Sequence, residues 1–410
     1  MSSIDETPRG SLFPSRATGQ LGWARKAMDR LLCDIRYGRL RISLPSGHII
    51  EKRGTQPGPE ADIVIYKWRM LRRVIIAGDI GFAEGFIRGE WTSTDLTAVI
   101  RFAARNSDAL TSAIKGSLPI RLLNRLQHAL RANTKRGSRR NIEAHYDLGN
   151  DFYKEWLAPS MLYSSAIFEE DKQTLEAAQT KRLDLIREKL MLAGGETVLE
   201  IGCGWGALAV DLATKSDARV TGITLSPSQL AWALNTAAEA GKASNVDLRL
   251  QDYRDTDGCY DRIVSIEMFE AVGEAYWPSY FQTLKRCLKN DGRALLQIIT
   301  IEEVRFEAYR GSIDFIQKYV FPGGFLPSDT ALHAAVTAAG LKLTAVEHFG
   351  KSYARTLAEW RGRFHTRWPA IAAQGFDARF KRLWHYYLCY CEAGFEEGTI
   401  NVGFYTIEHA

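Results

Sequence analysis

A glycine-rich turn between a strand and a helix limits what this chain can fold into more than any other segment. The segment VLEIGCGWGALA at residues 198–209 runs from strand-like residues into GCGWG and then into a helical pattern. Its glycines, Gly202, Gly204 and Gly206, fall at the carboxyl end of the strand, where open α/β sheets bind ligands. Glycine allows a ligand to approach the backbone closely, because it has no side chain. The segment therefore predicts a ligand-binding α/β sheet.

The spacing within this turn indicates the kind of ligand. It is G-x-G-x-G and differs from the dinucleotide pattern G-x-G-x-x-G. Glu200 precedes the turn, and its carboxylate would repel a pyrophosphate but could engage a cation or a hydroxyl group. These features favour a nucleoside cofactor over a dinucleotide.

The next two predicted strands end in polar residues that suit such a cofactor. VTGIT ends at Thr224 and is followed by Ser226-Pro227, a helix start that places Gln229 in the first turn. LQDYRD then supplies Asp252 and Tyr253, one polar contact and one stacking face for an adenine. We expect all four residues to contribute to the cofactor site: Thr224, Gln229, Asp252 and Tyr253.

Strands and helices alternate from residue 180 onward, which is typical of a parallel sheet covered on both faces. We predict strands at 197–202, 218–224, 246–250, 260–266, 292–299, near 341–347 and at 399–407. We predict helices at 174–191, 206–215, 227–241, 275–289, near 328–339 and over 355–390.

The N-terminal third has a different pattern, and 410 residues exceed the usual size of one hydrophobic core. RLRISLPSGHII predicts a hairpin, and GFAEGFIRGEW, ending at Trp91, predicts a glycine-punctuated turn region. The predicted domains are a disordered N-terminus at 1–20, an α+β domain at 21–110 associated with lipid or membrane, a basic helical linker at 111–140 and a catalytic domain at 141–410.

Composition narrows the function classes. Hydrophobic residues make up 46% of the chain and charged residues 25%, which excludes global disorder. The six cysteines lack disulfide or metal spacing and the N-terminus lacks an apolar signal core, so we expect a cytoplasmic location. Lone histidines such as His145, His348 and His365 give no metal-ligand spacing, and we predict no metal site.

Together these segments resemble the cyclopropane-fatty-acyl-phospholipid synthases and their mycolic-acid methyltransferase relatives. The resemblance rests on eight segments: HYDLGNDFYKEWL (145–157), MLYSSAIFE (161–169), LEIGCGWGALA, GITLSPSQ (222–229), QDYRD, YDRIVSIEMFEAVGE (260–274), KYVFPGGFLPS (318–328) and YARTLAEW (353–360). It implies a class I methyltransferase, with a Rossmann-like seven-stranded α/β sheet, beside a smaller N-terminal α+β domain. It also implies S-adenosylmethionine as cofactor and adds Tyr163 and Ser164 to the cofactor-contacting positions.

The resemblance further implies a reaction in which a cis double bond of an acyl chain takes the sulfonium methyl group. A bound bicarbonate then removes a proton and a cyclopropane ring closes. The positions that match the family's bicarbonate cradle are Ser165, Glu270, Gln297, Ile299 and Tyr353. Ser165 stands where the family has cysteine and Gln297 where it has histidine, while Glu267 replaces a usual glycine. The changes leave open whether bicarbonate binds and whether the product is a ring or a methyl- or methylene-branched chain.

The expected partners follow from the resemblance and from charge. Residues 115–140 hold eight lysines and arginines without an acidic residue, which suits the anionic surface of a membrane. We therefore expect peripheral docking on the inner membrane face and unsaturated phospholipid acyl chains as substrate. Nucleic acid is disfavoured because no aromatic residues are interleaved with these arginines. A homodimer, methylation of a small soluble molecule and a non-catalytic lipid-binding role are left open.

Overall fold

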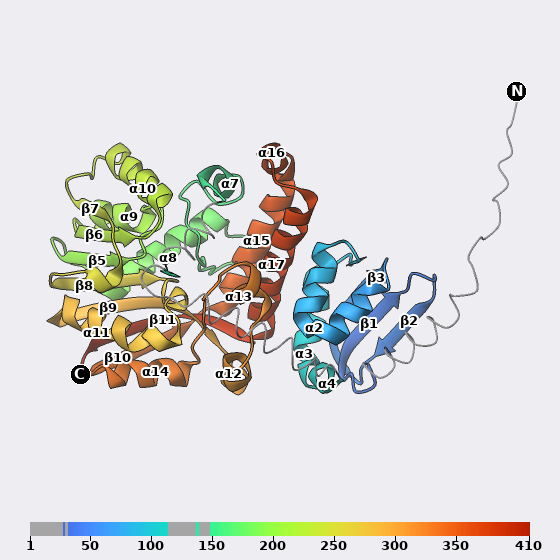
Figure 1. Cartoon of the computed structure of the whole chain (residues 1–410). Coiled ribbons are helices and arrows are strands. Elements are labelled where there is room, and N and C mark those ends of the chain that lie inside the picture. Colours follow the sequence, from blue (N-terminus) through green and yellow to red (C-terminus); the bar gives the residue numbers. More distant parts are fainter. Residues whose placement is uncertain (1–27, 29–31, 114–136, 139–147) are drawn as a thin grey trace, which may run out of the picture. The chain divides into compact units, whose positions relative to one another are not determined.

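The computed structural model describes residues 28, 32–113, 137–138 and 148–410 (Figure 1). The chain divides into two compact units, one of residues 1–85 and 89–116 and the other of residues 86–88 and 117–410. The predicted disordered segment 1–20 lies outside the described residues, as does nearly all of the predicted basic linker at 111–140.

The N-terminal unit contains a four-stranded mixed sheet in the order β2-β1-β3-β4. Its strands are β1 (Tyr37–Ser43), β2 (Ile49–Arg53), β3 (Gln56–Ile65) and β4 (Trp91–Thr92). Strands β1 and β2 pair in antiparallel fashion around the Pro45-Ser46-Gly47 turn, which confirms the predicted hairpin. Strand β3 pairs with β1 in parallel and with β4 in antiparallel orientation.

The prediction of a turn region for GFAEGFIRGEW is wrong over most of its length. Helix α2 (Arg69–Ile87) continues through this segment after a kink at Gly78, whose φ is 59°. A Cβ at Gly81 would lie 2.1 Å from the Arg73 carbonyl oxygen, so the close approach across the kink requires a glycine there. Tertiary packing thus overrides the low helix propensity of glycine. Helices α3 (Leu96–Arg105) and α4 (Ser107–Ala113) complete the unit.

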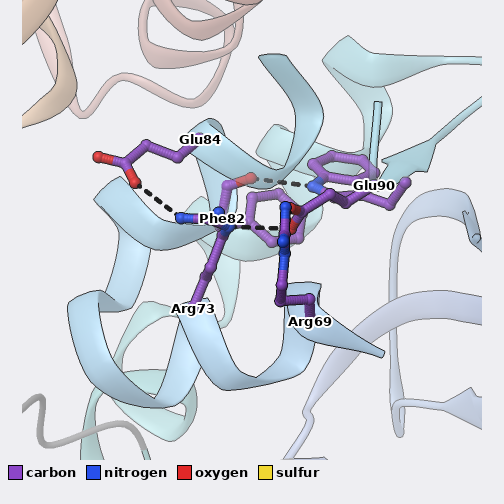
Figure 2. Close-up of polar contacts among 6 residues, drawn as sticks. Arg69, Arg73, Phe82, Glu84 and Glu90 are labelled. Carbon is purple, nitrogen blue, oxygen red and sulfur yellow. Dashed lines mark hydrogen bonds and ion pairs between the residues drawn. The ribbon is translucent and has the colours of Figure 1, made fainter. Parts of the chain in front are cut away.

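The strand that follows α2 is fastened to the helix by a buried carboxylate (Figure 2). Glu90, whose side chain is 1% exposed, accepts hydrogen bonds from Arg69 at 3.0 and 3.1 Å and from Arg73 at 2.9 Å. Trp91 donates from Nε1 to the Phe82 carbonyl oxygen at 2.9 Å. Because a buried charge is tolerated when it is paired, the two arginines stabilise the helix-strand junction.

The C-terminal unit is built on a seven-stranded sheet in the order β10-β11-β9-β8-β5-β6-β7. Its strands are β5 (Thr197–Ile201), β6 (Arg219–Thr224), β7 (Val246–Leu250), β8 (Tyr260–Ile266), β9 (Leu288–Ile301), β10 (Leu341–His348) and β11 (Ile400–His409). The adjacent strands β9, β8, β5, β6 and β7 are parallel to one another, while β11 runs antiparallel to both of its neighbours, β9 and β10. The predicted seven-stranded α/β sheet is confirmed.

Helices cover both faces of this sheet (Figure 1). They are α7 (Asn150–Lys154), α8 (Leu175–Leu190), α9 (Ala207–Lys215), α10 (Pro227–Glu239), α11 (Trp277–Cys287), α12 (Glu303–Arg310), α13 (Phe315–Tyr319), α14 (Asp329–Ala338), α15 (Gly350–Thr366), α16 (Trp368–Ala373) and α17 (Ala378–Glu397). Alternate residues of β5 point to opposite faces: Val198 packs with α8, α9 and α10, whereas Leu199 packs with α11 and α14.

The predicted helix over 355–390 is instead three helices. Pro369 lies in the first turn of α16, and Gly375, with φ of 101°, separates α16 from α17. Helices α15 and α17 lie side by side, and they carry aromatic residues of the candidate site (Figure 1). The short helices α12 and α13 were not predicted, because each is too brief for a periodic pattern.

Candidate active site

The predicted cofactor turn has the backbone geometry that requires glycine. Gly202, Gly204 and Gly206 have φ of 87°, 53° and 86°. A Cβ at Gly206 would lie 2.8 Å from the Ala233 Cβ, so this glycine allows α9 and α10 to approach. A Cβ at Gly204 would meet nothing within 4 Å. Gly204 therefore borders open space that a ligand can enter.

Two other predicted cofactor residues, Thr224 and Gln229, lie at the same edge of the sheet. Thr224, the last residue of β6, donates from Oγ1 to Gln229 Oε1 at 3.0 Å, and both side chains are buried. Ser226 caps α10 by accepting a hydrogen bond from the Gln229 backbone N–H at 3.3 Å, as the Ser226-Pro227 pattern predicts.

Asp252 and Tyr253 follow β7, where Asp252 caps a short helical turn, η1 (Tyr253–Asp255), that begins at Tyr253. Arg254 donates to both carboxylate oxygens of Asp252, at 2.8 and 2.6 Å. The Tyr253 ring packs edge-on against Tyr280, with 5.3 Å between the ring centroids. The carboxylate is thus already neutralised locally, while the tyrosine ring forms part of the core.

Tyr163 belongs to a cluster of aromatic rings, and Ser164 beside it is buried. The Tyr163 hydroxyl lies 2.8 Å from that of Tyr387. The rings belong to segments far apart in sequence: Tyr153, Trp156, Tyr163, Trp205, Trp360, Trp384 and Tyr387. Trp205 comes from the glycine-rich turn itself, so the cluster adjoins the cofactor turn. The faces of aromatic rings attract cations.

A buried carboxylate, Glu267, brings three of the predicted catalytic residues together. It follows β8 and accepts hydrogen bonds from the Ser165 backbone N–H at 2.9 Å and from Gln297 Nε2 at 2.6 Å on Oε1. The Tyr353 hydroxyl donates to Oε2 at 2.5 Å. The Ser165 hydroxyl itself donates to the Ala166 carbonyl oxygen. Glu267 has φ of 51°, a conformation that costs a non-glycine residue roughly 1–3 kcal/mol.

A second carboxylate lies three residues further along, at Glu270. Its Oε1 accepts a hydrogen bond from the Ile299 backbone N–H at 2.6 Å. Its Oε2 is buried and has no hydrogen-bond partner among the described residues. Burial, with the nearby negative charge of Glu267, raises the pKa of Glu270 to about 8. The structure thus brings Ile299 to Glu270 and the other predicted catalytic residues to Glu267.

Arg182 in α8 is a site residue that the sequence did not reveal. Its side chain is 1% exposed and donates to Gln297 Oε1 at 3.3 Å. Its charge acts on both Glu200 and Glu267, and burial lowers its own pKa to about 10, so the guanidinium stays protonated at neutral pH. Lys181 and Arg187 share the helix and are more exposed. Arg182 falls at helical spacing on the apolar face with Leu175, Ile186 and Leu190, and this position is the signal that could have identified it.

The described site holds more acidic groups than cationic ones. The positive charge of Arg182 interacts favourably with the carboxylates of Glu200 and Glu267, whereas the negative charge of Glu267 disfavours ionisation of Glu270. Glu200 is 3% exposed, and its Oε2 has no partner among the residues described. Unpaired buried carboxylates are costly unless they are protonated or meet a cation. Together with the open space at Gly204, they fit a cationic nucleoside cofactor.

We predict that cofactor binding releases a proton from Glu200. Burial raises the pKa of Glu200 to about 8, well above its ordinary value of 4.5. Between these values the folded state keeps a proton that the unfolded state has lost, so the free energy of unfolding falls as pH rises through this window. A sulfonium cation favours the ionised form, and S-adenosylmethionine affinity should therefore rise with pH up to about 8.

Calorimetry in buffers of different ionisation enthalpy measures this proton directly. Glu200→Gln should release less than the wild type, with a flatter dependence of affinity on pH. Equal proton release by the two proteins would contradict the assignment to Glu200.

Bicarbonate does not fit the donors that the family resemblance implies for it. Among the described residues, Ser165 N–H, Gln297 Nε2 and the Tyr353 hydroxyl already donate to Glu267, and Ile299 N–H donates to Glu270. A second anion placed among them would also face two carboxylates. In the part of the chain described, no group of three or more His, Cys, Asp or Glu side chains could hold a metal ion.

Residues 133–404 match the family described as mycolic acid cyclopropane synthetase. The chain belongs to this family. Tuberculostearic acid methyltransferase UfaA1 of Mycobacterium tuberculosis is 38% identical over 348 residues, covering 82% of this chain and 81% of the relative. The cyclopropane-fatty-acyl-phospholipid synthase of Escherichia coli strain K12 is 35% identical over 374 residues, covering 90% of this chain and 92% of the relative.

A solved structure extends the similarity to the fold of this cyclopropane synthetase family member. Mycolic acid cyclopropane synthase CmaA1, complexed with SAH and CTAB, is 33% identical with a TM-score of 0.62. The match covers 66% of this chain and 97% of that one. The chain is therefore an S-adenosylmethionine-dependent methyltransferase with the class I fold. Among the described residues, no helix is long and apolar enough to span a membrane.

Proposed function

We propose that this methyltransferase transfers a carbon from S-adenosylmethionine to the double bond of unsaturated phospholipid acyl chains. The observation that carries the proposal is the set of carboxylates Glu200, Glu267 and Glu270, which Tyr353 joins to the aromatic cluster: its hydroxyl donates to Glu267 and its ring packs against Trp360. When bound, the cofactor supplies an electrophilic methyl group. An alkene that accepts it becomes a carbocation, which demands negative charge, aromatic faces and exclusion of water.

The residues of the chain would divide these tasks. The glycine turn would hold the cofactor, with Glu200 near the positive charge. Tyr163, Trp360 and neighbouring rings would surround the acyl chain and exclude water. The positive charge of the cofactor would favour the ionised form of Glu270, which would stabilise the cation through its unpaired oxygen. Tyr353 and Gln297 position Glu267 by hydrogen bonds.

The names of two relatives support an acyl-chain substrate and differ in the product. One is a tuberculostearic acid methyltransferase and the other a cyclopropane-fatty-acyl-phospholipid synthase. A methyl- or methylene-branched chain is the second candidate product. A branched product is favoured because the groups expected to donate to bicarbonate donate to Glu267 instead. The surroundings of the cation therefore differ from those that the resemblance implies for ring closure.

Docking on an anionic membrane remains part of the proposal. The basic residues at 115–140 would contact lipid headgroups, and each lysine or arginine near such a surface contributes about 1 kcal/mol. Residues 137 and 138 are the described part of this segment. A homodimer and a cytoplasmic location are compatible with this arrangement.

Labelled cofactor tests the function directly. We expect purified protein with methyl-labelled S-adenosylmethionine to transfer label to vesicles of unsaturated phospholipid and to leave saturated vesicles and RNA unlabelled. Proton NMR of the released fatty acids then separates a ring from a methylene branch, which have the same mass. Absence of label in the unsaturated lipid would contradict the proposal.

A further inference from the structure

Glu267 is the group at this site whose chemistry the proposed function has not yet used. We propose that its carboxylate is the general base of the reaction and accepts the proton that the methylated acyl chain releases, so that this enzyme works without bicarbonate. The inference rests on the proposed function, because the carbocation formed on the acyl chain must lose that proton.

Three hydrogen bonds hold the Glu267 carboxylate in one position. The donors are the Ser165 N–H, Gln297 Nε2 and the Tyr353 hydroxyl, from three separate segments of the chain. Ser165 and Gln297 are fully buried, whereas Glu267 keeps some exposed surface. The carboxylate is thus held by buried groups, while the residue itself borders accessible space. A general base needs a fixed position, and these hydrogen bonds supply one.

The electrostatics of the site suit a carboxylate that works ionised and takes up one proton. Arg182 favours the ionised form, and so do the three donors. Burial acts in the opposite direction and raises the pKa of Glu267 above the ordinary range of a carboxyl group, which makes the carboxylate a stronger base. The fully buried Ser165 and Gln297 beside it limit the access of water, which would otherwise capture the cation.

The step balances without an external reagent. The π pair of the alkene forms the new carbon–carbon bond to the methyl group, and the pair of the broken sulfur–carbon bond stays on sulfur. The adjacent acyl carbon becomes cationic. For a ring, a C–H bond of the added methyl group breaks, its proton goes to a Glu267 oxygen, and its electron pair joins the methyl carbon to the cationic carbon. For a methylene branch, a hydride first shifts from the methylated carbon to the cationic carbon, and the electron pair of the methyl C–H bond then forms the double bond while the proton goes to Glu267. The methylated chain leaves neutral, and Glu267 later returns its proton to solvent.

Bicarbonate dependence tests this inference in the full-length protein. Wild-type enzyme, S-adenosylmethionine and unsaturated phospholipid vesicles are assayed in carbon-dioxide-free buffer with and without added bicarbonate. We expect equal rates. Stimulation of the wild type by bicarbonate of about tenfold or more would overturn the inference. Failure of the wild type to methylate lipid in either buffer would instead contradict the proposed function.

Two substitutions at Glu267 distinguish the effect of losing the carboxylate from the effect of opening a cavity. Glu267→Gly should lower the rate in bicarbonate-free buffer by at least about 100-fold, the usual contribution of a general base. Added bicarbonate should restore part of this rate, because the variant leaves three donors and a cavity for an anion. Glu267→Gln should be equally slow and should not be rescued, since the amide fills the cavity. Wild-type activity of either variant without bicarbonate would refute the assignment.

Asp217→Gly is a matched control for the backbone effect of this substitution. Asp217 is also an acidic residue in the left-handed conformation, with φ of 47°, but it is exposed and precedes β6 at the opposite edge of the sheet. Its variant should keep the wild-type rate.

Binding gives a readout that needs no turnover. By NMR of ¹³C-bicarbonate, the Glu267→Gly variant should bind the anion, whereas the wild type and Glu267→Gln should not. Equal binding by wild type and variant would contradict the inference, even if no lipid were methylated.

Discussion

Glu270→Gln is expected to lower kcat by roughly 100- to 1,000-fold, the size of effect seen when one electrostatic group is removed from a transition state. The amide oxygen can still accept the hydrogen bond from the Ile299 N–H, so the local structure should persist. The unpaired Oε2 becomes an amide NH₂, which cannot stabilise a cation. Steady-state rates, a thermal melt and the dissociation constant of S-adenosylmethionine together check the prediction.

The expected pattern is a large loss of kcat with little change in melting temperature or cofactor affinity. Glu274→Gln is the control, because Glu274 is partly exposed and pairs with Arg310 at the surface. Its variant should retain the wild-type rate. A Glu270→Gln enzyme with wild-type kcat would show that this carboxylate has no part in the reaction.

Alanine at Gly206 is expected to destabilise the protein more than alanine at Gly204. Both positions have positive φ, which costs alanine about 1–2 kcal/mol. At Gly206 the added Cβ also lies 2.8 Å from the Ala233 Cβ, and such overpacking costs roughly 1–3 kcal/mol more. Denaturant unfolding of the two variants should therefore differ by the cost of this contact.

Cofactor affinity should separate the two variants in another way. Alanine at Gly204 places a methyl group in open space, so we expect S-adenosylmethionine binding to weaken about tenfold or more. The free energy of unfolding should fall only by the backbone strain of the positive φ. Calorimetric titration measures the loss. Unchanged affinity in the Gly204→Ala variant would place the cofactor elsewhere.

Local features explain which elements the sequence predicted well. Strand β5, the glycine turn and the Ser226 cap of α10 depend on residues within a few positions of each other, so their pattern is visible without tertiary information. The turn prediction for residues 81–91 was wrong, because Gly78 and Gly81 serve a kink inside α2. A glycine's role there depends on the strand and helix packed around it.

The sequence by itself determined the sheet and predicted its ligand-binding edge and a nucleoside cofactor, because these follow from local spacing and from glycine's lack of a side chain. Only the tertiary structure revealed the surroundings of Glu267. Its carboxylate takes hydrogen bonds from residues 102, 30 and 86 positions away, and α8 adds the buried Arg182 through Gln297. The environment that fixes a carboxylate's position and basicity is made of such distant groups, and no local pattern records them.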